Sequence, residues 1–322
     1  MKNYFEYLPQ VSYAAGILNG VFVGKDRIIA TDHLTVGDID PDKFDLIFVL
    51  CAETTFKIRP IINQFREKVI LIHTSVEPGL ENYNNYFFPH WLFAVKETNN
   101  INDYITRKAS PKYSYNMLLG RAKDWRTDLL KLVDERNLLD KGLVSYHYGK
   151  HYMPKTTIDP TPYFRSVWEY EDELIKQLYN NDLNYNVKND STTRLANGHF
   201  SSCLIPRLIL NESIISVITE TDLGSHHAFF TEKTWKSFLG NQHCIFYTGK
   251  KHEDYLIELG FELMFPIHAD PLKVVNIIGD IERAGIKGYT FRDWDELTSH
   301  NYYHANSKHW ENNFYKWLLT TF

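Results

Sequence analysis

Short apolar runs alternate with longer amphipathic stretches in the first third of the chain. Segments 45–50 (DLIFVL) and 69–75 (VILIHTS) are predicted to be buried strands, and 55–68 between them is predicted to be a helix with Pro60 in its first turns. The apolar run 91–97 (WLFAVKE) is predicted to be another strand. Strand–helix–strand succession is typical of a parallel sheet covered by helices, so this part is expected to be an α/β domain.

A polar stretch at 98–112 is the best candidate for a domain boundary, because the alternation restarts after it. The pattern then predicts further strands, two clear helices and a helical C-terminal segment of two or three helices from about Asp270. The strands are expected at 113–120, 142–149, 213–220 and 244–249, and the helices at 121–140 and after Thr231. Two αβα domains of unequal size account for this order.

Composition limits the classes of protein that need to be considered. Of the 322 residues, 43% are hydrophobic and 23% charged, which is typical of a folded globular chain. The formal net charge of −5 gives no bulk attraction to nucleic acid, although a local basic groove would be compatible with it. The three cysteines are widely spaced and form no CxxC pair, which indicates reduced thiols and a cytoplasmic location. No run of about 18 apolar residues occurs, so no membrane span is expected.

The segment FFTEKTWKSFLG (229–240) has two interpretations. In the first, Thr231 caps a helix, Glu232 lies in its first turn, and the pattern needs no ligand. In the second, the helix begins at the carboxyl edge of a sheet, where ligands of open α/β sheets bind. There a carboxylate suits a ribose diol and the ammonium of Lys233 suits a phosphate, so the pair points to a nucleotide.

The junction NMLLGRAKDWRTDLL (116–130) places a glycine and three cations between a strand and a helix. Backbone N–H groups at a helix start attract anions, and Arg121, Lys123 and Arg126 add positive side chains there. The alternative is that these are solvated helix residues. Basic residues oppose the helix dipole at this end, so a phosphate partner and a solvated face are equally good accounts.

The segment FFTEKTWKSFLGNQHCIFYTG (229–249) resembles the donor-site segment of the α-1,3-fucosyltransferases. The resemblance implies that Glu232 holds the ribose of a nucleotide sugar and that Lys233 contacts its phosphates. GRAKDWRTDLLKLV looks like the strand–loop–helix whose arginine binds the pyrophosphate, with Arg126 the first choice and Arg121 the second. Glu220 matches the position of a donor-site acid in the same family.

The segment 71–95 (LIHTSVEPGLENYNNYFFPHWLFAV) is similar to the acceptor-side segment that carries the family's catalytic acid. By that resemblance Glu77 would be the general base that deprotonates the acceptor hydroxyl. The plain alternative is a turn residue before Pro78 and Gly79.

The resemblance implies a GT-B fold, in which two Rossmann-like αβα domains face each other across a cleft. We expect an acceptor-side domain at 1–108, a nucleotide-sugar donor-binding domain at 109–290, and C-terminal helices at 291–322 that cross back onto the first domain. Similar glycosyltransferases are encoded by bacteriophages, for which the location would be the host cytoplasm. Segment 146–181 departs from the fucosyltransferase pattern, which leaves the donor sugar open.

The implied activity is inverting sugar transfer from a nucleotide diphosphate sugar, with no cofactor and no metal. The short motif DID at 38–40 and the histidines at 226–227 lack the context of a metal site. The acceptor would be a hydroxymethylated pyrimidine in DNA or a cell-surface glycan such as lipopolysaccharide, and a non-catalytic sugar-nucleotide or glycan-binding relative is a further alternative. A DNA acceptor needs a basic stripe, for which the candidates are Lys57, Arg59, Arg66, Lys68, Arg107, Lys108 and Lys112.

Overall fold

The first parallel sheet is built from the N-terminal residues of the chain. The structure is a computed structural model, and it describes residues 2–4, 9–99, 111–147, 203, 205–221, 223, 227–288 and 292–322. The sheet has the strand order β1-β2-β3-β4-β6, with every neighbouring pair parallel. Its strands are β1 (Lys2–Tyr4), β2 (Ile28–Asp32), β3 (Leu46–Cys51), β4 (Val69–His73) and β6 (Asn84–Phe87).

Helices cover both faces of this sheet, which is why β3 is apolar at every position and β4 is apolar up to its last residue, His73. One face packs against α1 (Pro9–Val21) and α3 (His90–Asn99), and the other packs against short helical turns. The turns are η1 (Val36–Asp38), η2 (Pro41–Lys43), α2 (Arg59–Ile62), η3 (Asn63–Lys68) and η4 (Leu80–Asn82).

The second sheet has the order β11-β9-β7-β8 and is also parallel throughout. The strand order reverses at β7: the next strand in the chain, β8, lies on one side of β7, and the later strands β9 and β11 lie on the other. Such a switch point leaves a gap between the loops at the carboxyl edge, where ligands of α/β proteins bind. The elements are β7 (Tyr113–Arg121), α4 (Asp124–Glu135), η5 (Leu139–Lys141), β8 (Gly142–His147), α8 (Arg207–Glu212), β9 (Ser213–Ile218), α9 (Glu232–Leu239), β11 (His243–Phe246), α10 (Lys250–Glu258) and α11 (Pro271–Gly288).

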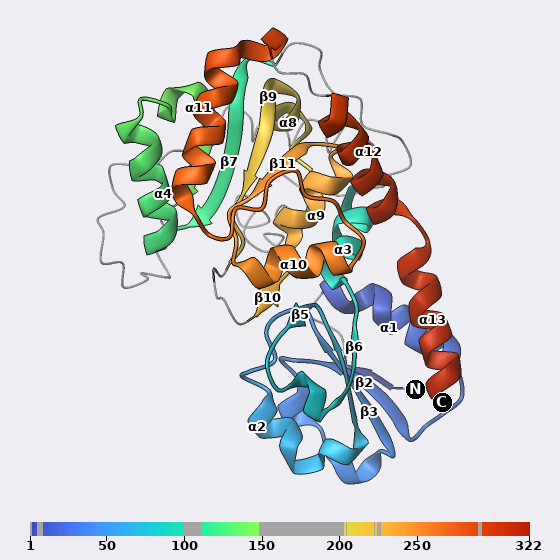
Figure 1. Cartoon of the computed structure of the whole chain (residues 1–322). Coiled ribbons are helices and arrows are strands. Elements are labelled where there is room, and N and C mark those ends of the chain that lie inside the picture. Colours follow the sequence, from blue (N-terminus) through green and yellow to red (C-terminus); the bar gives the residue numbers. More distant parts are fainter. Residues whose placement is uncertain are drawn as a thin grey trace, which may run out of the picture.

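A two-stranded antiparallel ladder joins the two α/β units, as Figure 1 shows. It pairs β5 (Ser75–Val76) with β10 (Ala228–Phe229). Because β5 follows the end of β4 and β10 lies between the end of β9 and the start of α9, the ladder connects the carboxyl edges of the two sheets. Loops from both units therefore meet at this place.

The chain ends by returning to the first unit. Helix α12 (Arg292–Asn306) packs on α9 and β11, and α13 (His309–Thr321) runs beside α1 (Figure 1). The ring of Trp317 lies 4.6 Å from that of Tyr86 in β6, and Phe322 reaches Phe22 and Phe48. The predicted fold class, two Rossmann-like α/β units with C-terminal helices that cross back, is confirmed.

The domain limits themselves stay a prediction, since residues 100–110 lie outside the described part of the chain. Strands of the first sheet all fall within 1–108 and those of the second within 109–290. Among the described residues, no helix is long and apolar enough to cross a membrane.

Two secondary-structure predictions in the first unit are wrong. Segment 91–97 belongs to helix α3, whose residues Trp91 to Val95 are all at most 9% exposed because the helix is enclosed between α1 and α9. A continuous apolar run has no periodicity, so it cannot distinguish a buried helix from a buried strand. Segment 55–68 is not one helix but α2 followed by η3, broken at Phe65 with φ −142°. Segment 146–181 lies almost wholly outside the described residues.

Candidate functional site

The switch point of the second sheet is held together by cations from the start of α4. Arg126 donates from Nη2 to the carbonyl oxygens of Thr219 (3.1 Å) and Glu220 (3.0 Å), just beyond β9. Lys123 donates from Nζ to the carbonyl oxygen of Thr221. The loop after β7 is thus tied to the loop after β9 across the point where a ligand would be expected.

Arg126 is almost completely enclosed in this arrangement, with 2% of its surface exposed. Burial lowers the pKa of its guanidinium to about 10, and the Glu220 carboxylate opposes that change, so the group stays charged at neutral pH. The guanidinium also lies 4.7 Å from the ring centre of Trp125. Its predicted role on a pyrophosphate stays a prediction. Arg121 is the last residue of β7, where its backbone pairs with His147, and its side chain lies outside the description.

Glu220 is a fully buried carboxylate that holds the start of α9. Its oxygens accept from the amide of Thr231 (3.0 Å), the hydroxyl of Thr231 (2.5 Å) and the hydroxyl of Thr234 (2.7 Å). Thr231 is the N-cap of α9, as predicted, and its hydroxyl oxygen accepts from the amide of Lys233 at 3.4 Å. Glu220 therefore fixes the position of the helix end, and a contact to a donor molecule stays a prediction.

Glu232 and Lys233 form an ion pair at the first turn of α9, with 2.9 Å between Oε1 and Nζ. Their side chains are 12% and 19% exposed. Burial alone would raise the pKa of Glu232, but the charges of Lys233 and Lys236 bring the pKa below its ordinary value. Burial lowers the pKa of Lys236, an effect that Glu232 opposes.

The structure thus brings together five of the residues predicted for donor binding, although their separate roles are not tested by it. The group consists of Arg126, Glu220, Thr231, Glu232 and Lys233. With Lys236, the side chains carry three positive charges against two negative ones, next to the positive end of a helix dipole. The balance favours an anion.

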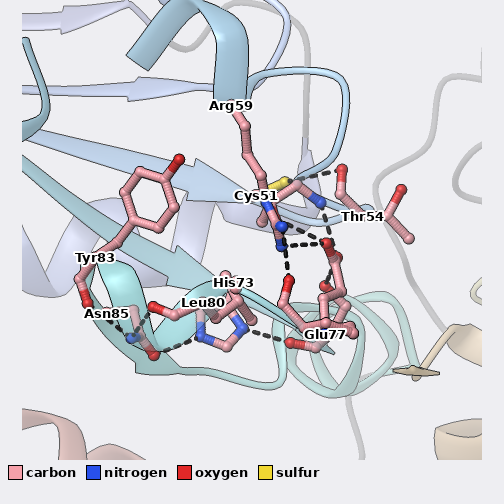
Figure 2. Close-up of polar contacts among 12 residues, drawn as sticks. Cys51, Thr54, Arg59, His73, Glu77, Leu80, Tyr83 and Asn85 are labelled. Atoms are coloured by element: carbon pink, nitrogen blue, oxygen red, sulfur yellow. Dashed lines mark hydrogen bonds and ion pairs between the residues drawn. The ribbon is translucent and has the colours of Figure 1, made fainter. Parts of the chain in front are cut away.

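Glu77 is also buried, at 4% exposure, and all its oxygens have donors, as Figure 2 shows. Thr55 donates from its amide to Oε1 (2.8 Å) and from its hydroxyl to Oε2 (2.8 Å). Arg59 donates to Oε2 at 3.0 Å, and Ser75 donates from its hydroxyl to Oε1. With four donors on two oxygens, Glu77 braces the loop after β3 against the β5–β10 ladder. A role as general base stays a prediction, and it would require one of these bonds to be released.

The basic stripe proposed for a DNA acceptor is only partly present at the surface. Arg59 belongs to the Glu77 network, where Nη1 also donates to the carbonyl oxygen of Pro78 at 2.6 Å. Lys68 donates to the carbonyl oxygen of Pro41 at 3.1 Å. The other three described cations of the stripe, Lys57, Arg66 and Lys112, are exposed. Arg107 and Lys108 lie outside the described residues.

Sequence reasoning missed a set of polar residues at the carboxyl edge of the first sheet. Asp32 ends β2, His33 follows it, Thr74 follows β4 and His90 begins α3. The available signal was the position of a polar residue directly after a buried apolar strand, in IIATDH and VILIHT. Within the described part of the chain, no three His, Cys, Asp or Glu side chains come together in the way that a metal site would require.

Comparison with known proteins gives a distant structural likeness. Neither the family models nor the curated proteins include a match to this sequence. Among solved structures, the chain is similar to a crystal structure of the DNA-modifying enzyme β-glucosyltransferase, which was determined with and without its substrate uridine diphosphoglucose. The two share 11% sequence identity at a TM-score of 0.40, over 89% of this chain and 88% of the other.

Proposed function

We propose that this chain is a glycosyltransferase that moves a sugar from a nucleotide diphosphate sugar to a hydroxyl group, with inversion and without a metal ion. The observation that carries the proposal is the group at the start of α9. The partly buried pair Glu232–Lys233 lies at the carboxyl edge of a parallel sheet, beside Arg126 and Lys236. A ribose diol fits a carboxylate, and a diphosphate fits several cations at a helix N-terminus.

The same cations have a catalytic use in this proposal. When the bond between the sugar and the diphosphate breaks, negative charge develops on the departing phosphate oxygen. Lys233 and Lys236, held in a partly buried site, stabilise that charge more than they would in water. In many enzymes a divalent cation provides this stabilisation, and here the ammonium groups and the helix end would replace it.

The acceptor is a hydroxyl, either of a hydroxymethylated pyrimidine in DNA or of a glycan. Two observations weaken the DNA alternative, because they leave fewer cations for phosphate contacts. Arg59 forms an ion pair with Glu77, and Lys68 donates to the backbone carbonyl of Pro41. Exposed Lys57 and Arg66 remain on the surface of the first unit. Binding to DNA would weaken steeply as salt is raised, whereas binding to a neutral glycan would not.

A thermal-shift screen against UDP, GDP, CMP and TDP, with and without EDTA, tests the donor site. At one hundred times its dissociation constant, a nucleotide adds about 2.7 kcal/mol of stability, which corresponds to a rise in Tm of several degrees. We expect such a rise for one nucleotide, unchanged by EDTA. It should be lost in Lys233→Met and reduced in Glu232→Gln.

Glu258→Gln is the matched control, because Glu258 is exposed on α10. If no nucleotide raises Tm, the Glu232–Lys233 pair is an ordinary helix start and the proposal fails. If a nucleotide binds but no nucleotide sugar is ever consumed, the chain is a non-catalytic relative. Hydrolysis of the donor by water alone would establish a catalytic site before the acceptor is known.

A further inference from the structure

Buried polar atoms without a hydrogen-bond partner gather at the carboxyl edge of the first sheet. In the described part of the chain they include Oδ2 of Asp32, Nδ1 of His33, Oγ1 of Thr74 and Nδ1 of His90. Asp32, Thr74 and His90 are each 0% exposed. Native proteins seldom leave such atoms unpaired, so a group of them in one place indicates a ligand or a bound water.

These residues are neighbours across the sheet. Asp32 pairs with Leu50 between β2 and β3, and Cys51 pairs with His73 between β3 and β4. Adjacent strands lie about 4.8 Å apart, so the three strand ends form a row about 10 Å long. His33 and His90 are close enough to interact electrostatically.

Three of the four atoms can only accept a hydrogen bond. His90 faces the carbonyl oxygen of Ile72 with Nε2 at 3.1 Å, so Nε2 carries the proton and Nδ1 is a lone pair. The backbone of Leu50 lies near the His33 ring and raises its pKa slightly, and Nδ1 has no partner, so the neutral ring directs Nε2–H toward Leu50 and leaves a lone pair on Nδ1. Asp32 uses Oδ1 to cap the turn at Leu34 and Thr35, which leaves Oδ2.

A site that offers lone pairs requires a ligand that offers O–H groups. The nearby carboxylates of Asp32 and Glu53 disfavour an anion such as a phosphodiester. We propose that this edge of the first sheet binds a neutral sugar acceptor through its hydroxyls, and that His33 is the general base. The inference rests on the proposed glycosyl transfer and names the acceptor side of the same reaction.

His33 suits this role better than His90. Burial lowers the pKa of His90 to about 3, which makes it a poor base, so it positions the acceptor. His33 is only half-buried. Burial lowers the pKa of His33, Glu53 and Asp32 raise it, and Lys57 lowers it. Burial is the largest of these effects, so the pKa lies below its ordinary value and the imidazole is neutral at pH 7, with a lone pair that can accept a proton.

The step balances without any further reactant. The proton of the acceptor hydroxyl moves to Nδ1 of His33, and the oxygen forms a bond to the anomeric carbon of the donor sugar. The bond from that carbon to the diphosphate breaks, and its electron pair stays on the diphosphate. The carboxylates of Asp32 and Glu53 stabilise the imidazolium that results.

Two near-isosteric variants test the proposal in the full-length chain. His33→Gln keeps an N–H for Leu50 and removes the basic nitrogen. Asp32→Asn keeps Oδ1 as a cap and turns the unpartnered oxygen into a donor. Asp270→Asn is the matched control, since Oδ1 of Asp270 caps Leu272 (2.9 Å) and Lys273 (3.4 Å) far from this edge.

Turnover of UDP-, GDP-, CMP- and TDP-sugars is measured with methyl glycosides, with 5-hydroxymethyl-2′-deoxycytidine and with water as acceptors. We expect His33→Gln to lower kcat by about 10²- to 10⁴-fold with the donor KM unchanged, and to remove the fall of rate at acid pH. Asp32→Asn should raise KM for the glycoside about tenfold. Asp270→Asn should stay within twofold. Wild-type rates in both site variants would overturn the proposal, as would transfer to the nucleoside and to no glycoside.

A titration of the histidine ring nitrogens by NMR separates this inference from the proposed function. Signals of His33 are assigned by their loss in His33→Gln, and an unprotonated Nδ1 at pH 7 is expected. Methyl glycosides should shift the His33 and His90 signals in the wild type, and the same shifts in Asp32→Asn should need about ten times more glycoside. If no donor is ever consumed, the proposed transfer fails, but such shifts would still establish the sugar site. Unchanged signals would refute it whether or not a nucleotide binds.

Discussion

Glu220 offers a clear separation between a residue that braces the structure and one that binds a ligand. Its carboxylate is 0% exposed and accepts three hydrogen bonds from the first turn of α9. In Glu220→Gln the amide keeps one oxygen, but its NH2 group faces a donor. At least one threonine donor is left unsatisfied, which costs about 1–3 kcal/mol.

The loss of charge adds to this effect, because Arg126 is buried next to Glu220 and depends on it for electrostatic compensation. Arg126 bonds to the backbone of Glu220 and not to its carboxylate, and Glu232 also compensates its charge, so the two effects together should not exceed the roughly 3–5 kcal/mol that removal of one member of a buried ion pair costs. We therefore expect Glu220→Gln to reduce the free energy of unfolding by up to about 3–5 kcal/mol, a large share of a typical total of about 5–15 kcal/mol.

Urea denaturation followed by tryptophan fluorescence measures this difference, with Glu258→Gln as the exposed control that should change stability by less than about 0.5 kcal/mol. A brace lowers stability equally with and without a nucleotide. A residue that only contacts the donor would leave the stability of the free protein unchanged and reduce nucleotide affinity. A Glu220→Gln variant within 1 kcal/mol of the wild type would refute the brace.

Three further predictions concern the core. Trp235→Ala should cost about 3–5 kcal/mol in urea, because the ring is 0% exposed, whereas Trp235→Phe should cost less than about 1.5 kcal/mol, since the indole N–H has no partner to lose. Gly142→Ala should lower Tm and reduce stability by about 1–3 kcal/mol, because a Cβ would overlap the buried ring of Tyr115; unchanged stability would mean that the ring can move. Burial lowers the pKa of His252 to about 3. The stability that the buried neutral ring contributes is therefore complete above pH 6.5 and is lost as pH falls toward 3, because the unfolded chain takes up a proton that the folded chain does not. At pH 4.5 the loss is about 2–3 kcal/mol, and His252→Leu should remove that part of the acid sensitivity in denaturation curves measured at pH 7 and 4.5.

The sequence was sufficient for the architecture because most strands of both sheets are buried on two faces. The runs in β3, β4 and β9 contain almost only apolar residues, and their order of appearance indicated parallel sheets. Helix α3 was not predicted as a helix because its apolar run is buried on all sides. Strand β6 was not predicted because two of its four residues, NNYF, are asparagine. Enclosure by neighbouring helices determined α3 and pairing with β4 at the sheet edge determined β6, and the local sequence pattern indicates neither.

The cluster at the start of α9 could be expected from sequence for a physical reason: chain order places α9 at the carboxyl edge of β9, although binding of a donor there stays a prediction. Which cation faces a ligand could not be determined. The cation of Arg126 contacts two carbonyl oxygens on a loop 93 and 94 residues further along the chain. Nothing near Arg126 in the sequence indicates those partners, and an arginine that binds phosphate has the same local context.

The partners of the two acidic residues on either side of the β5–β10 ladder, Glu77 and Glu220, also could not be predicted from the neighbouring sequence. Glu77 accepts from the amide and hydroxyl of Thr55, and Glu220 accepts from the amide and hydroxyl of Thr231. Each carboxylate thus fixes the start of a helical turn at the carboxyl edge of its own sheet, and the ladder connects the two edges. A displacement of α9 on donor binding would therefore reach the loop after β3, where Glu53 lies near His33. Glu77, which resembles a catalytic acid in sequence, and Glu220, which resembles a donor-site acid, would then hold the two loops in register, while in the proposed reaction the proton is taken by Nδ1 of His33, which has no hydrogen-bond partner.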